Sequence, residues 1–496
     1  MKTSIITLAV VLLLAGAADA QTPPDQPVPA LTPASLASVP LTIAPLPTAS
    51  LSPTLFDQAQ RPCDGCPPRS VGKALFQVTM VNVLYEMANL IRGQDTAKIT
   101  PKTWWRNMER GWEWDLDDFA VNQVGHPYQG NNYFTTGRAN GMNFWESAGL
   151  TAFGSSTWEY FGETNQASLN DFINTTLGGI ALGEMFYRTA WLVRNTSKAP
   201  RHANEILALA IDPMTGLNRY LSGDANRVHE KPPEVVPSDL GALLSVGVLA
   251  RGSNTDEVPD NIAGFFETDL FYGDLTKDRS RVPYDAFAVR LAFGGGSAFS
   301  EARVRGRLFS EPLGSGSWLL TISQGYQYNS NDAYQFGAQS ADVHLGWVKA
   351  FSSTTSMFLS FFGGATILGA VDSVPPGTEI VEPDPDPDAG QGVSTGPRYY
   401  DYGPGANAGA FLTLSRNQRA FFALSYELHH LHILDGFRAE HVLQRLRGDV
   451  LIPIKGKVGA GVAGEFFDRT TYYSPGQEKV QYRFPQVRFY MTWRVS

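Results

Sequence analysis

The sequence predicts an α+β protein, with an N-terminal helical module followed by an antiparallel transmembrane β-barrel of about 12 strands. Apolar residues recur with helical spacing from about residue 70 to 200, and from Leu240 onward apolar and polar residues alternate with a period of two. The 496-residue chain is also poor in charge (18%) and rich in glycine and aromatic rings, with 48 Gly, 29 Phe and 19 Tyr. This composition favours many short strands over long polar-faced helices.

The N-terminus predicts export. Lys2 precedes an apolar run from Ile5 to Leu14, and Ala18-Asp19-Ala20 matches a signal-peptide cleavage site, so residues 1–20 are expected to be removed. The apolar run is shorter than the roughly 20 residues of a spanning helix, which argues against an uncleaved anchor. The formal net charge of -9 argues against a nucleic-acid partner, because phosphate binding needs a basic surface.

Residues 21–69 are predicted to form a proline-rich tether that contains the two cysteines of the chain, Cys63 and Cys66. In an exported protein these are disulfide candidates. A redox site would place the second cysteine at a helix start, which Pro67-Pro68 does not clearly offer. A zinc site would need further ligands at suitable spacing, and none follows.

The helical module is predicted over residues 70–230. Apolar periodicity indicates helices from Val71 to Arg92, from Ser147 to Tyr160 and from Leu169 to Val193, the last with Ser168 or Asn170 as its N-cap. The Trp-rich, polar segment between the first two helices is predicted to be irregular. No later run of eighteen apolar residues without charge follows the signal peptide.

The barrel is predicted over residues 231–496. Twelve segments of suitable length and alternation are 240–251, 262–273, 284–294, 301–310, 316–328, 333–348, 354–369, 398–414, 419–431, 436–448, 451–466 and 480–494. Connections after the sixth, eighth and tenth segments are short, and those after the seventh and eleventh are long, including an acidic stretch from Glu379 to Gly390. This asymmetry is typical of an outer-membrane barrel with both ends in the periplasm. Some segments alternate poorly, so a two-layer sandwich is the alternative.

Polar residues of these strands are expected to line a lumen. Arg303, Arg305 and Arg307 form one stripe and Arg290 begins another. Ser425, Glu427 and His429 also share one face; they are interpreted as lumen lining, with a hydrolase site on the wall as the alternative.

The helical module contains many short motifs that, taken together, are specific for one protein family. They include Trp104-Trp105-Arg106-Asn107, Gly111-Trp112-Glu113-Trp114-Asp115, Gly125-His126-Pro127-Tyr128, Phe144-Trp145-Glu146-Ser147, Trp158-Glu159-Tyr160-Phe161-Gly162-Glu163, Asn170-Asp171, Thr175-Thr176-Leu177-Gly178-Gly179, Gly183-Glu184 and Tyr187-Arg188. Over about residues 70–230 the chain resembles the bacterial family catalogued as domain of unknown function 3943. The resemblance implies an exported, outer-membrane protein and no established activity.

The candidate catalytic residues of this module are His126, Arg138, Glu159, Glu163 and Asp171. His126 with a carboxylate could act as a general base on a lipid ester, with Ser147 or Ser155 as the nucleophile, although no G-x-S-x-G motif is present. The same groups could bind a divalent ion, but H-E-x-x-H spacing is absent and no metal ligand is assigned. A buried hydrogen-bonded network is the favoured alternative.

Helical spacing gives three further expectations. Glu159 and Glu163 lie four apart and would repel unless a cation, a shared proton or an arginine lies between them, and Arg138 is the nearest arginine candidate. Glu184 and Arg188 are expected to form an ion pair. Glycines 178, 179 and 183 indicate close approach between helices.

The sequence therefore predicts a protein of the outer membrane of a Gram-negative bacterium, in contact with outer-membrane lipids. The favoured role is non-enzymatic, in envelope organisation or in passage of a small or lipidic solute. The alternative is a lipid-modifying hydrolase or acyltransferase. No cofactor is indicated, and the module could plug the lumen, lie beneath it or lie on the leaflet.

Overall fold

The computed structural model describes residues 66–495, except 116, 195–201, 228–230, 256–260, 277–278, 315–316, 332–333, 374–399, 418 and 474–478. The predicted signal peptide, most of the tether with Cys63, and the acidic stretch from Glu379 to Gly390 lie outside the described residues. The signal peptide and the disulfide therefore stay predictions.

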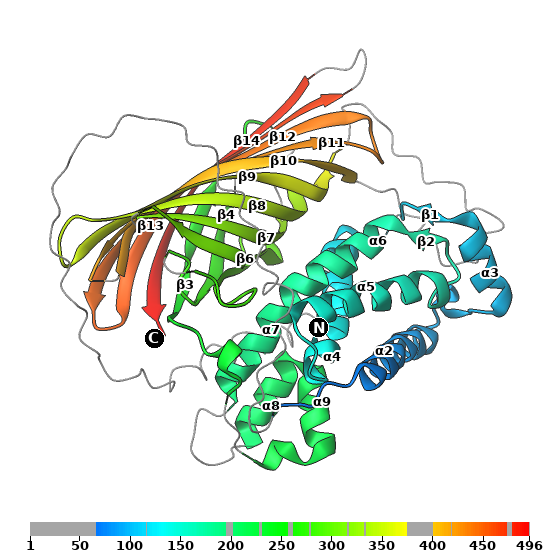
Figure 1. Cartoon of the computed structure of the whole chain (residues 1–496). Coiled ribbons are helices and arrows are strands. Elements are labelled where there is room, and N and C mark those ends of the chain that lie inside the picture. The colour runs from blue at the N-terminus through cyan, green and yellow to red at the C-terminus, as the bar shows by residue number, and fades with distance from the viewer. Residues whose placement is uncertain are drawn as a thin grey trace.

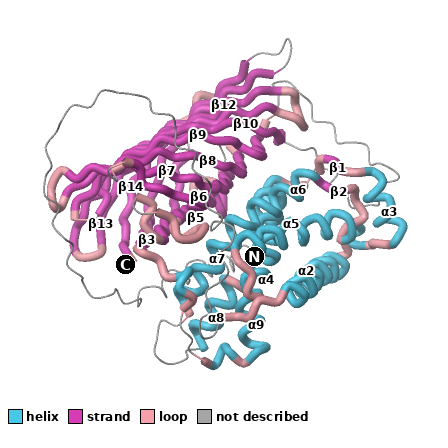
Figure 2. Tube along the Cα trace, viewed as in Figure 1, coloured by secondary structure: helices cyan, strands magenta, loops and turns pink. Residues whose placement is uncertain are grey.

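The first part of the described chain is a bundle of helices (Figures 1 and 2). Its helices are α2 (Val71–Ile91), α3 (Pro101–Arg110), α4 (His126–Ala139), α5 (Phe144–Phe161), α6 (Leu169–Ile173), α7 (Gly179–Val193), α8 (His202–Ile211) and α9 (Pro213–Ser222). Short strands β1 (Trp112–Glu113) and β2 (Ala167–Ser168) pair in parallel at one end of the bundle.

Two predictions about this bundle were wrong in detail. The segment expected to be irregular contains α4, which is preceded by a π-helical turn over Val121–Gly125. Nearly every residue of α4 is buried, including its asparagines and threonines, so it lacks the apolar stripe that marks a half-exposed helix. The helix predicted over 169–193 is interrupted by a second π-helical turn at Asn174–Gly178, and Ser168 is its N-cap.

Glycines set the distance between the central helices. A Cβ on Gly130 of α4 would lie 1.8 Å from the backbone oxygen of Thr175 and 2.8 Å from the Cα of Gly179, so α4 and α7 touch through their backbones. A Cβ on Gly183 would collide with Phe134. The expected close helix approach is confirmed, and it resembles the small-residue packing of membrane helices.

The second part is a closed antiparallel barrel, as predicted, and the sandwich alternative is wrong. The neighbour order is β10-β11-β12-β13-β14-β3-β4-β5-β6-β7-β8-β9, with β9 also paired to β10. The strands are β3 (Leu240–Arg251), β4 (Asn261–Tyr272), β5 (Phe287–Gly294), β6 (Ser297–Leu313), β7 (Trp318–Ser330), β8 (Gln335–Ala350), β9 (Thr355–Asp372), β10 (Tyr400–Arg416), β11 (Arg419–His432), β12 (Ala439–Lys455), β13 (Val458–Tyr473) and β14 (Lys479–Arg494).

The connections follow the predicted asymmetry with two corrections. The turns after β8, β10 and β12 are short and the connection after β9 is long, as expected. The connection after β13 is only residues 474–478, because β13 continues to Tyr473. The connection between β4 and β5 is long although it lies at the short-turn end, and its residue Pro283 accepts a hydrogen bond from Arg188 of the bundle.

The two faces of the barrel wall can be assigned from contacts across it. Arg303 on β6 bonds Glu427 on β11, and these strands are not neighbours, so both side chains point into the lumen. Because successive side chains alternate, Val304 points outward, and so does Tyr326, its partner on β7.

The helical bundle packs on the outward face of this wall and does not enter the lumen. Tyr326 donates a hydrogen bond to the backbone oxygen of Gln123 (2.6 Å), and Gln324 donates to that of Leu177 (2.8 Å). Phe119 stacks on Tyr328 with ring centroids 5.7 Å apart. The contacts extend over strands β4 to β10, and Figure 1 shows the bundle beside the strands.

Helix α2 forms an outer side of the bundle and leaves most of its apolar residues exposed. Phe76 and Leu84 are each 63% exposed and Ile91 is 84% exposed. With 21 residues and a mean hydropathy of 1.3, it is the one helix in the described part of the chain that is long and apolar enough to cross a membrane.

Candidate functional site

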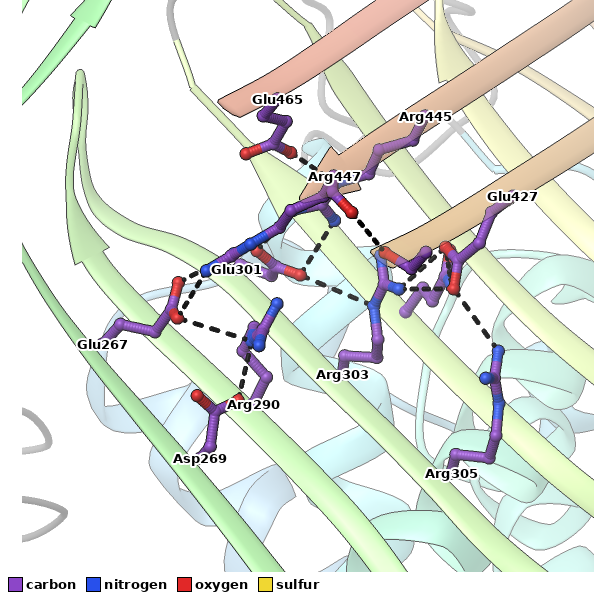
Figure 3. A network of polar contacts seen from close by, with 12 residues as sticks. Glu267, Asp269, Arg290, Glu301, Arg303, Arg305, Glu427, Arg445, Arg447 and Glu465 are labelled. Atoms are coloured by element: carbon purple, nitrogen blue, oxygen red, sulfur yellow. Dashed lines mark hydrogen bonds and ion pairs between the residues drawn. The ribbon is translucent and has the colours of Figure 1, made fainter. Parts of the chain in front are cut away.

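The lumen is occupied by a charge-balanced set of side chains, here called the lumen network (Figure 3). It consists of Arg290, Arg303, Arg305, Arg445, Arg447 and Arg488 with Glu267, Asp269, Glu301, Glu427, Glu465 and Asp449. The stripes predicted from Arg290, Arg303 and Arg305 therefore do face the lumen.

Several ion pairs of the lumen network join opposite walls. Arg445 of β12 binds Glu301 of β6 at 2.9 Å, and Arg447 of β12 binds Glu267 of β4 at 2.9 Å. Glu267 also accepts from Arg488 at 2.9 Å. Bidentate arginine contacts of this kind hold both partners in fixed geometry.

Packed rings fill the lumen nearer the end that carries the 373–399 connection. Tyr334 stacks on Phe467, with ring centroids 3.6 Å apart, and Phe484 and Leu431 belong to the same buried cluster. Cavities bordered by the lumen network and these rings measure only about 30 and 20 Å³. Each has room for about one water molecule.

The predicted wall residues take part in this filling. Glu427 binds Arg303, and the ring of His429 packs edge-on against Phe336 at 4.9 Å. The hydroxyl of Ser425 donates to the backbone oxygen of Arg447 at 3.5 Å and not to His429. Ser425, Glu427 and His429 therefore line the lumen and do not form a hydrogen-bonded catalytic set.

A second polar set lies where the bundle meets the barrel. It is called the junction cluster and consists of Asp115, Asp117, Asn122, His126, Asn170 and Asp171. His126 is at the start of α4, with Nδ1 3.3 Å from the Thr175 hydroxyl and Nε2 3.4 Å from Asp171 Oδ1. The ring is 7% exposed.

Two asparagines organise the carboxylates of the junction cluster. Asn170 donates to Asp115 at 2.7 Å and to Asp171 at 2.9 Å. Asn122 donates to Asp115 at 2.9 Å and to the hydroxyl of Tyr400 at 2.8 Å. Tyr400 belongs to β10, so the cluster joins the bundle to the barrel wall.

Acidic surroundings dominate the electrostatics here. Burial, together with Asp115 and Asp118, raises the pKa of Asp117 above its usual range. Burial and Asp117 likewise raise the pKa of Glu163, which lies in the loop after α5. Each shift disfavours the charged carboxylate, as expected where like charges share a desolvated site.

The five predicted catalytic residues are only partly brought together. His126 and Asp171 meet, and Glu159 lies nearby, where it accepts the backbone N–H of Ser168 at 2.8 Å. Glu163 accepts from the indole of Trp158 at 3.1 Å. Arg138 was expected between the two glutamates, and this was wrong.

Arg138 lies at the other end of α4. It binds Glu184 at 3.1 Å and Glu234 at 2.7 Å, and Glu184 also accepts from Arg188 at 2.8 Å. The predicted pair of Glu184 and Arg188 is thus confirmed. Arg138 belongs to this buried ion-pair group because α4 carries it roughly 18 Å along the helix axis from His126.

The predicted nucleophile Ser147 also lies far from His126. It packs against Gly137, whose Cβ would come within 2.5 Å of the serine oxygen. Gly137 is eleven residues beyond His126 on α4, a rise of roughly 16 Å.

Six residues at this site were not predicted from the sequence, namely Asp115, Asp117, Asn122, Asn170, Tyr400 and Tyr402. The first four stood within or beside the quoted motifs. Tyr400 and Tyr402 belong to β10, almost 230 residues after Asp171. The sequence indicated only that they are outward-facing strand residues whose side chains end in a hydroxyl. Tyr402 stacks on Trp114 with ring centroids 5.5 Å apart.

Part of the helical module matches a known protein family. Residues 111–214 match the family model described as domain of unknown function DUF3943. The predicted resemblance to this family is confirmed. The matched segment contains all six residues of the junction cluster. No curated protein matches the sequence.

About half of the chain is similar to solved outer-membrane barrels. The NanC porin is 8% identical over 50% of this chain and 98% of its own, with a TM-score of 0.26. Omp33 of Acinetobacter baumannii is 10% identical over 51% of this chain and 98% of its own, with a TM-score of 0.22. The COG4313 outer membrane channel of Pseudomonas putida F1 is 12% identical over 53% of this chain and 99% of its own, with a TM-score of 0.23.

Proposed function

We propose that this chain is an outer-membrane protein whose barrel anchors a lipid-embedded helical bundle, and that its role is structural, in the organisation of the envelope. The observation that carries the proposal is the lumen network, because its ion pairs cross the barrel and the two cavities beside it measure only about 30 and 20 Å³. The proposal favours envelope organisation over solute passage.

The outward face of the barrel supports a membrane location. Where the bundle does not cover it, this face exposes apolar side chains such as Val248 (52%), Val343 (51%) and Phe489 (56%). Each alternates with lumen-facing residues along its strand, which is the pattern of a barrel in lipid.

The position of the bundle extends this lipid-facing surface. It covers the outward wall that would otherwise contact acyl chains, and α2 adds an exposed apolar helix about 31 Å long, close to the roughly 30 Å of a bilayer core. The backbone of Ser70, at the start of α2, donates to Asn140 at the end of α4, so neighbouring helices run in opposite directions.

Single-channel recording in planar bilayers tests the closed lumen. We expect no steady conductance from the wild type, and open events from the double variant Glu301→Gln and Glu427→Gln, which loses two of the wall-to-wall contacts. Stable pores formed by the wild type would contradict the proposal.

Photo-crosslinking tests the lipid contact of α2. A benzophenone side chain placed at Phe76 or Leu84 should label phospholipid in vesicles as efficiently as one placed at Val343 on the barrel. The exposed position Lys98 serves as the control and should label far less. Equal labelling at Lys98 and Leu84 would show that the helix lies outside the lipid.

Lipid modification is the second candidate, and the approach of His126 to Asp171 at 3.4 Å favours it. A buried imidazole with a carboxylate close enough to approach it can act as a general base. Mass spectrometry of phospholipid and lipopolysaccharide incubated with the wild type and with His126→Gln would reveal a product that depends on His126. Identical lipid profiles would exclude this activity for the lipids used.

A further inference from the structure

We propose that the junction cluster binds one divalent cation of the Mn²⁺ or Zn²⁺ class through Asp115, Asp117 and His126. One ligand atom from each of these side chains lies within 4.8 Å of the other two. Ligands bonded to one such ion at 2.0–2.2 Å in a tetrahedral arrangement lie about 3.3–3.6 Å apart, so side-chain movements of up to about 1 Å complete the site.

The imidazole provides an independent indication of a ligand. His126 Nε2 is buried and has no hydrogen-bond partner in the described part of the chain. A carboxylate oxygen of Asp171 is 3.4 Å away, which is longer than the 2.7–3.2 Å of a hydrogen bond. A buried ring nitrogen that faces carboxylates without bonding them is placed to bind an ion between them.

The other ring nitrogen is held as metal-binding histidines usually are. Nδ1 lies 3.3 Å from the Thr175 hydroxyl, which orients the ring and leaves Nε2 free to coordinate. Asn122 and Asn170 both donate to Asp115 and fix its carboxylate. These contacts form an outer shell around the proposed ligands.

The charge around the site also calls for a cation. Asp117 lies beside Asp115, and Asp171 lies near Asp115, Glu159 and Glu163. Such a collection of desolvated carboxylates is costly unless protons or a cation neutralise it. Asp171 is within reach to supply a further oxygen.

The donor set indicates the class of ion. Oxygen ligands alone would suit Mg²⁺ or Ca²⁺, whereas one imidazole with carboxylates suits Mn²⁺ or Zn²⁺. Asp115 and Asp117 lie in the segment before α4, and Asn122 joins the same region to Tyr400 of the barrel. The ion would therefore fasten the bundle at its contact with β10, whatever the function of the protein.

Metal analysis of the full chain tests this inference. Protein purified in detergent is stripped with EDTA, equilibrated with MnCl₂ or ZnCl₂, and measured by mass spectrometry of the metal, with electron paramagnetic resonance for Mn²⁺. We expect one ion per wild-type chain. His126→Gln and Asp117→Asn should each lower the affinity by more than about 100-fold, because loss of a direct ligand exceeds the 10–100-fold effect of an outer-shell change.

Asp118→Asn is the matched control, because Asp118 is an exposed carboxylate beside Asp117 and is not one of the proposed ligands. It should retain the ion. Heat-modifiable migration on gels confirms that each variant is folded. Absence of saturable binding by the wild type would overturn the inference, and so would an equal loss of affinity in Asp118→Asn and Asp117→Asn.

Discussion

The lumen network and the junction cluster are both buried polar assemblies, but they differ in charge balance. The lumen network pairs six arginines with six carboxylates, and four of its contacts, including those across the lumen, are 2.7–2.9 Å long. The junction cluster collects Asp115, Asp117 and Asp171 around a single histidine. A balanced network stabilises a closed barrel, whereas an unbalanced one requires protons or a bound cation.

The comparison also separates two ways of filling space. Long side chains that meet across the lumen fill the barrel. In the bundle, glycines let the helix backbones pack directly against each other. Many buried polar side chains there form hydrogen bonds with nearby residues of the bundle. Substitutions should therefore have effects of different size, and in one case of different sign, in the two regions.

The largest effect is expected in the lumen network. Glu267→Gln removes the charge that two buried arginines, Arg447 and Arg488, share, and should lower the free energy of unfolding by about 3–5 kcal/mol. Urea unfolding in vesicles measures it. Glu440→Gln is the control, because Glu440 pairs with exposed histidines on the outer face and should cost less than about 1 kcal/mol.

A backbone contact of the bundle should be nearly as sensitive. Gly130→Ala places a methyl group against the backbone of Thr175 and should destabilise the bundle by about 3 kcal/mol. Gly149→Ala on α5 has open space around its Cβ and should be neutral or stabilise by up to about 1 kcal/mol. Equal effects in thermal unfolding would contradict the proposed helix packing.

A single hydrogen bond between bundle and barrel should matter less. Tyr326→Phe leaves the backbone oxygen of Gln123 without its 2.6 Å donor and should cost about 1–2 kcal/mol. Limited proteolysis of the bundle should become faster as it separates from the wall. Tyr472→Phe, at an exposed position, is expected to leave the rate unchanged.

The smallest effect has the opposite sign. In EDTA-treated protein, Asp171→Asn removes one charge from a group of carboxylates and should stabilise the fold by about 1 kcal/mol, because the repulsion it relieves exceeds what the neutral amide loses. Thermal unfolding at pH 8 measures it. If Asp171→Asn destabilised the fold as much as Glu267→Gln, the negative charges of the junction cluster would have to be balanced by positive groups, as they are in the lumen network.

Strand positions were predictable because the outward face of a barrel strand meets apolar surroundings along its length. The first strand, Leu240–Arg251, has the predicted bounds. The prediction ended β12 and β13 too early. Residues after 448 and 466 still pair with the neighbouring strands. The end of a strand depends on its register with these neighbours and not on the alternation of apolar and polar residues alone.

The candidate site was predictable only in part. The meeting of His126 with Asp171 followed from their shared motif-rich segment, but the role of Arg138 did not. Helical spacing shows which residues share a face of one helix, but it does not show which other helix or strand each end of a buried helix contacts. The π-helical turns before α4 and before α7 also change which residues share a face.

The amino-acid sequence by itself determined a helical module, an alternating series of strands and a segment crowded with rings and carboxylates, because these depend on local periodicity and composition. Only the tertiary structure decided that the bundle lies on the outer wall and that the lumen is filled by its own ion pairs. Those outcomes depend on contacts between residues more than a hundred positions apart, such as Arg303 with Glu427 and Gln123 with Tyr326. Barrel closure brings such residues together.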